Sequence, residues 1–126
     1  MFCLFILYVS DQNKSKEFYQ SVLNCKPTLD VTGMTEFTLN ENAKLGLMPE
    51  KGIAKILGDK VPHPSKGNGL PRAEVYLYFK GAIECFDRAV KLNAKLIQEP
   101  VEMDWGHRVA YVADSDGHIL AFAEDI

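Results

Sequence analysis

Hydrophobic and polar positions follow the same order twice along this chain. Residues 7–26, LYVSDQNKSKEFYQSVLNCK, and residues 77–95, LYFKGAIECFDRAVKLNAK, each begin with an aromatic-rich strand pattern. In both copies a turn and a stretch of helical period follow the strand, and Leu-Asn comes after the helical stretch. The copies begin about 70 residues apart. The repeat therefore predicts two related modules, each opening with a strand and a helix.

The ends of both predicted helices carry recognisable signals. Three polar residues are candidates for the N-cap of the first helix: Ser10, Asp11 and Asn13. Gly81 can open the second helix. Asn24 and Asn93 stand where the helices should end, and asparagine tolerates the left-handed backbone found there. In the second helix the expected buried face consists of Ile83, Phe86, Ala89 and Val90.

Short strand patterns follow each helix, near 27–32, 34–39 and 43–49 in the first half and near 95–102, 106–113 and 118–124 in the second. Gly33 and the Asp116-Gly117 pair supply hairpin turns. Each half thus has the order β-α-β-β-β, and a half of about 60 residues is marginal alone. We predict an α+β fold of two tandem βαβββ modules, about 1–49 and 73–126, forming a single domain with curved mixed sheets around a shared cleft.

Residues 50–72, EKGIAKILGDKVPHPSKGNGLPR, form a linker between the modules. The segment is rich in proline and glycine, and the pattern predicts only one or two helical turns, around 53–57. It carries an excess of lysine and arginine in an otherwise acidic chain. A connector of this length is either mobile or a functional lid, and its charges also suit an ordinary solvated loop.

Composition narrows the class of protein. The 126 residues carry a net charge of −3, so no global positive field favours nucleic acid or an anionic membrane. The cysteines are three in number and lack a C-x-x-C pair, which suits free thiols in a reducing compartment. The apolar start MFCLFILYV is too short to span a bilayer and is read as a buried strand. We expect a cytoplasmic protein with no nucleic-acid or membrane partner.

Two segments carry a family likeness. LYVSDQNKSKEFYQSVL resembles the first strand and helix of the vicinal oxygen chelate superfamily, which includes glyoxalase I, bleomycin and fosfomycin resistance proteins and extradiol dioxygenases. WGHRVAYVADSDGHILAFAED resembles its closing hairpin, usually written W-G-x-R and D-P-D-G-N. Here Ser115 replaces the usual proline and His118 the usual asparagine. The resemblance covers essentially the whole chain and implies the paired βαβββ fold.

The resemblance also implies where a divalent metal would be held. The four ligand positions of the family, usually His, Glu or Gln, fall on Leu4, near Gly46, on Glu74 and on Ala121. Three of these side chains cannot donate a lone pair, and a single carboxylate does not retain a transition metal usefully. We therefore expect no metal and no other cofactor.

Alternation along the strands predicts which side chains share a face. Those expected to face the cleft are Leu4, Ile6, Tyr8, Glu74, Tyr76, Tyr78, Ile119, Ala121 and Ala123. We assign ligand binding to Tyr8, Tyr76 and Tyr78 over a shallow floor at Ala121, since tyrosine offers a flat face and a hydroxyl. The same tyrosines also suit ordinary half-buried strand positions.

Three further residues are candidates with more than one role. Glu74 can act as a catalytic general base, recognise a cationic ligand, or form a structural ion pair. Trp105 can stack on a planar ligand, or cap the rim of the cleft or a subunit interface. Arg108 can bind a carboxylate or phosphate, or form a surface ion pair.

These residues favour a homodimer that binds a small molecule without metal, resembling the bleomycin resistance branch and sequestering an antibiotic or another toxic compound. The alternative is a glyoxalase-type lyase or isomerase, or a dioxygenase, using Glu74. A regulatory protein that retains only the fold is a third class.

Overall fold

The computed structural model describes the whole chain, residues 1–126, as two compact units: 1–20 with 24–68, and 21–23 with 69–126. The elements of the first module are β1 (Cys3–Val9), α1 (Gln12–Leu23), β2 (Leu29–Val31), β3 (Met34–Asn40) and β4 (Ala43–Pro49). Those of the second are β5 (Glu74–Tyr78), α3 (Ala82–Lys91), β6 (Lys95–Glu102), β7 (His107–Ala113) and β8 (Ile119–Asp125). The predicted α+β fold with two tandem βαβββ modules is confirmed.

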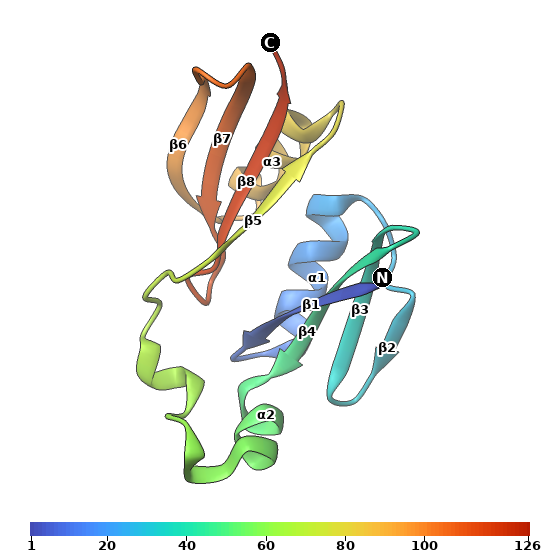
Figure 1. Ribbon diagram of the computed structural model, residues 1–126, viewed down its shortest axis with the longest axis vertical. Helices are drawn as coiled ribbons and strands as arrows, with labels where there is room; N and C mark the ends of the chain where they lie inside the picture. Colours follow the sequence, from blue (N-terminus) through green and yellow to red (C-terminus); the bar gives the residue numbers. More distant parts are fainter. The chain divides into compact units, whose positions relative to one another are not determined.

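Each module forms a mixed sheet of four strands (Figure 1). The strand order is β1-β4-β3-β2 in the first sheet and β5-β8-β7-β6 in the second. In both, the first strand of the module lies parallel to the last, and the remaining neighbours are antiparallel. The repeat in the sequence is therefore a repeat of topology.

The predicted helix ends are confirmed in detail. Asp11 is the N-cap of α1, where its side chain accepts a hydrogen bond of 3.0 Å from the backbone N–H of Lys14. Asn24 ends this helix at φ 54°, and Asn93 follows α3 at φ 68°, both in the left-handed region. Gly81 opens α3 at φ 101°, a backbone conformation that favours glycine.

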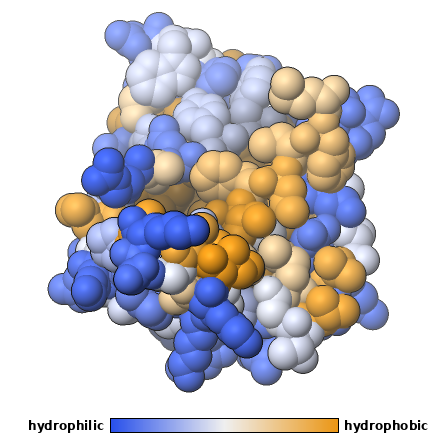
Figure 2. All heavy atoms as spheres, turned by 60° about the horizontal axis from the view of Figure 1, so that its bottom comes forward, coloured by the Kyte–Doolittle hydropathy of each residue, from blue (hydrophilic) through white to orange (hydrophobic).

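The linker contains more helix than the sequence predicts. Helix α2 runs over Glu50–Leu57, and two short 3₁₀ helices follow at Gly58–Lys60 and Pro64–Gly67. No residue of α2 is buried. Its amphipathic pattern therefore leaves apolar side chains such as Ile56 in solvent, and Figure 2 shows hydrophobic atoms at the surface among hydrophilic ones on the face it views. None of the helices is long and apolar enough to cross a membrane.

In the second unit α3 packs against β7 and β8. Its buried residues are Ala82, Cys85, Phe86 and Ala89. Val90, which the periodicity placed on this face, is instead exposed, because it lies to one side of the buried stripe that ends at Ala89. The Glu124 carboxylate of β8 accepts hydrogen bonds from the backbone N–H groups of Gly81 and Ile83 at 3.0 and 2.9 Å. This carboxylate satisfies N–H groups that a helix start otherwise leaves unpaired.

The turn between β7 and β8 lies directly against the end of the linker, and this contact generates a stability prediction. A Cβ at Gly117 would lie 2.6 Å from both the Cα and the carbonyl oxygen of Gly69, whereas one at Gly33 would meet nothing within 4 Å. Both glycines have positive φ, 87° and 98°. We expect Gly33→Ala to lower the free energy of unfolding by about 1–2 kcal/mol through backbone strain alone. Gly117→Ala should lower the free energy of unfolding, measured in urea, clearly more than Gly33→Ala does. Equal losses in the two variants would contradict the backbone contact.

Candidate functional site

The face of the second sheet opposite α3 brings together most of the predicted site. Strand pairing places Tyr76 beside Ala121 and Tyr78 beside Ala123. On the other side of β8, Tyr111 pairs with Ala121 and His107 with Asp125. Directly paired residues share a face of a sheet, so side chains from β5, β8 and β7 meet here. Glu74 begins the same row on β5. We call this surface the open face.

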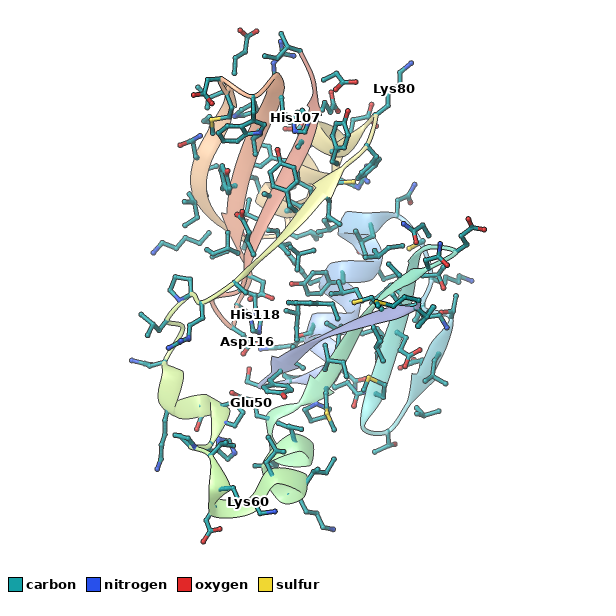
Figure 3. The ribbon with its side chains drawn as sticks, viewed as in Figure 1. Glu50, Lys60, Lys80, His107, Asp116 and His118 are labelled. Carbon is teal, nitrogen blue, oxygen red and sulfur yellow. The ribbon has the colours of Figure 1, made fainter.

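Four rings on the open face form what we call the aromatic cluster: Tyr76, Tyr78, Trp105 and His107. The Tyr76 hydroxyl lies 2.7 Å from His107 Nδ1 and accepts a hydrogen bond of 3.0 Å from Trp105 Nε1. The Tyr78 ring stacks on the imidazole with centroids 4.2 Å apart and planes 16° apart. Figure 3 shows His107 on the second sheet. Each ring is therefore oriented by a neighbour, although the tyrosines and Trp105 are exposed.

Asp125 fixes the end of the cluster. Its carboxylate oxygen Oδ1 accepts a hydrogen bond of 2.6 Å from the Tyr78 hydroxyl. This bond raises the pKa of Tyr78, with a smaller contribution from burial, because a phenolate would face the carboxylate. Tyr78 thus stays a neutral hydrogen-bond donor over the whole neutral range of pH.

The alanines of β8 form a base on which larger side chains rest. Ala121 and Ala123 are fully buried together with Val109, and Met103 and Tyr111 pack against them. Burial is the main cause that raises the pKa of Tyr111, followed by the charge of Glu74 and by Tyr76. The small side chains are explained by this close packing. Ala121 was expected to form the floor that a ligand touches, but its methyl group is covered.

Arg108 lies outside the aromatic cluster. Arg108 pairs with Glu124 in the sheet, on the face toward α3, and its guanidinium lies 3.4 Å from Glu102. Alternation turns Arg108 away from His107, and of its two predicted roles the structure shows the surface ion pair, while its role in ligand binding stays a prediction. Tyr8 belongs to the first unit, where it contributes to a cavity of about 120 Å³. The other lining residues come from the linker: Ile53, Ala54, Leu57, Gly58, Val61, Pro62, His63 and Pro64.

The four positions at which the family resemblance implies metal ligands do not fit a metal here. In the first unit a Cβ on Gly46 would meet side-chain atoms of Leu4, Ile6 and Met34 at 3.2–3.3 Å, so apolar side chains, including the Met34 thioether, cover this position. In the second unit Glu74 is an exposed carboxylate and Ala121 a buried methyl group. No group of three or more His, Cys, Asp or Glu side chains is placed to hold a metal ion. The side chains at these positions therefore do not supply the set of donor atoms that a catalytic metal ion requires.

Comparisons with known proteins agree with the topology. A family model described as the glyoxalase-like domain matches residues 2–126. The chain belongs to the glyoxalase-like domain family. This places it in the vicinal oxygen chelate superfamily, as the two sequence segments indicated. No curated protein sequence matches it.

Solved structures with the glyoxalase-like fold resemble the chain over nearly its full length. A glyoxalase-related enzyme from Fulvimarina pelagi has a TM-score of 0.81 at 19% identity, covering 99% of this chain and 88% of the other. A glyoxalase/bleomycin resistance protein/dioxygenase from Nocardioides has 0.71 at 19%, covering 100% and 83%. A glyoxalase/bleomycin resistance protein from Catenulispora acidiphila has 0.69 at 18%, covering 100% and 99%. At these identities the likeness establishes the fold alone.

Two residues of the open face, His107 and Asp125, are not among the site residues that the sequence predicts. Both follow from the alternation that located the tyrosines, since His107 lies two positions before Val109 and Asp125 two positions after Ala123. Extending the period to the strand ends would have placed both on the open face.

The contact between Tyr78 and Asp125 predicts a change in titration. Because the pKa of Tyr78 is raised, its contribution to stability is present below the ordinary tyrosine range and is lost as pH rises through the raised pKa. Asp125→Asn removes the largest cause, so Tyr78 should ionise at lower pH. The ionisation of Tyr78 is measured by tyrosinate absorbance. For the parent protein and for Asp125→Asn, the absorbance of the matching protein with Tyr78→Phe is subtracted. Asp87→Asn, on the exposed side of α3, is the control, and an unchanged titration in Asp125→Asn would refute the assignment.

Proposed function

We propose that this protein binds a flat small molecule on the open face, through the aromatic cluster and without a metal. The observation that carries the proposal is that exposed rings of Tyr76, Tyr78 and Trp105 are held in place by hydrogen bonds and stacking. Rings that are already oriented lose little freedom on binding, which favours affinity. Stacking also needs no nucleophile and no Lewis acid.

The biological role we propose is sequestration of an antibiotic or another toxic compound by a homodimer. The names of the Nocardioides and Catenulispora acidiphila structures include bleomycin resistance, which supports this class of role. Proteins of the vicinal oxygen chelate fold often form dimers. The alternative, an enzyme using Glu74, is supported only by the place of this carboxylate on the open face beside Tyr76 and Tyr111.

Binding at the aromatic cluster predicts a selective loss of affinity. The chain has a single tryptophan, so a ligand stacked in the cluster should change the fluorescence of Trp105. For a planar compound selected by thermal shift, Tyr76→Ala or Tyr78→Ala should weaken binding about tenfold, equivalent to about 1.4 kcal/mol, within the range of one aromatic contact. Phe79→Ala is the matched control, because Phe79 is exposed and follows Tyr78 on the opposite side of the strand. Equal losses in all three variants would rule out the cluster as the site.

The donor set at the family's ligand positions predicts little retention of metal. Untagged protein, dialysed against nickel, zinc, manganese and iron(II) and then freed of excess metal, should retain far less than one equivalent per chain by plasma mass spectrometry. Glu74→Ala should leave this value unchanged. One tightly held metal per chain that disappears in Glu74→Ala would favour the enzyme instead.

A further inference from the structure

The charges on the open face have one dominant sign near the aromatic cluster. Glu74 begins β5, and Asp125 ends the neighbouring strand β8. Both are exposed. Glu74 pairs with Ile119, six positions before Asp125, so the two carboxylates stand about 20 Å apart along the strands. Tyr76 and Tyr78 lie between them on β5.

Lysine and arginine are absent from this part of the face. The open-face positions of β5, β8 and β7 include no lysine or arginine, and Arg108 is directed toward α3. Lys80, which follows β5, extends away from the sheet in Figure 3. The nearest open-face lysine is Lys95 on β6, opposite Ala113. It lies three strands from Glu74, about 14 Å away.

We propose that the ligand of the open face is an elongated organic cation with a flat aromatic part. This inference rests on the proposed function and adds the sign of the ligand's charge. The faces of tyrosine and tryptophan rings attract cations. The carboxylates at either end then accept hydrogen bonds from, or pair with, positive groups at the ends of such a molecule.

The hydrogen bonds of the cluster suit this ligand. The Tyr78 hydroxyl donates to Asp125, and Trp105 Nε1 donates to Tyr76. The donors of these rings are thus directed at protein acceptors, while the side chains of Tyr76, Tyr78 and Trp105 remain exposed. An anionic ligand would need donors or positive charge, and the nearest cationic side chain of the face lies at its far edge. Charge complementarity therefore selects a cation.

Three probes of similar shape and different charge test the proposal: N-methylquinolinium, 2-naphthol and naphthalene-2-sulfonate. Isothermal titration calorimetry on the full chain should give the quinolinium cation at least tenfold higher affinity than the sulfonate. Its affinity should fall as salt is added, because exposed charges are screened. Glu74→Gln should weaken the cation about threefold or more and leave 2-naphthol unchanged. Asp87→Asn on α3 is the matched control, since it removes one exposed carboxylate away from the open face.

The outcomes separate this inference from the proposed function. If all three probes bind equally well and Tyr76→Ala weakens each, the aromatic site stands and cation selectivity is overturned. Preference for the sulfonate would overturn it as well. If no probe binds, the proposed function fails together with the inference. Glu74 is exposed, so Glu74→Gln should keep the melting temperature of the parent protein, and a lost affinity then reports on the ligand rather than on folding.

Discussion

The packing of the second unit depends on one constraint: its single helix, α3, covers only one face of the four-stranded sheet. Leu120 and Phe122 of β8 are buried on the helix side, and Glu124 caps the start of α3. The opposite face receives no helix, and alternation directs every second residue of β5, β7 and β8 toward it. The helix thus stabilises the unit from one side, and the aromatic cluster occupies the other.

The open face is ordered without a cover of its own. Small side chains at Ala121 and Ala123 let Tyr111 and Met103 pack closely on the sheet, which buries the methyl groups completely. Beside them, Tyr76, Tyr78 and His107 hold one another by a hydrogen bond and a stacked contact. A surface built in this way has its rings oriented by protein contacts before any ligand arrives, and such orientation favours stacking.

Periodicity and turn residues predicted most of the fold because they are local signals. The repeated strand-helix order, the cap at Asp11 and the left-handed asparagines all depend on a few neighbouring residues. The length of α2 was underestimated, since Gly52 and the prolines around it mask a helix that begins at Glu50. The burial of Ala121 depends on Met103 and Tyr111, which belong to other segments, and no local pattern contains that information.

The candidate site was predicted only in part for the same reason, since local patterns do not contain contacts between segments. Tyr76 and Tyr78 were found from alternation within one strand, but their partners come from β7, β8 and the turn between β6 and β7. Arg108 lies on the other face of the sheet and pairs with Glu102, since its neighbour His107 is the residue that reaches the open face. Residue type predicted which kinds of side chain form the site, but strand register determines which of them come into contact.

The last two acidic residues of β8 serve opposite sides of the sheet. Glu124 accepts hydrogen bonds from the start of α3, and the adjacent Asp125 accepts one from Tyr78 on the open face. Insertion or deletion of a single residue in β8 would exchange these directions and disrupt helix capping and ring placement together. A change in length between Gly117 and Asp125 thus disturbs both faces of the sheet at once, whereas a substitution at either acidic residue disturbs only one of them.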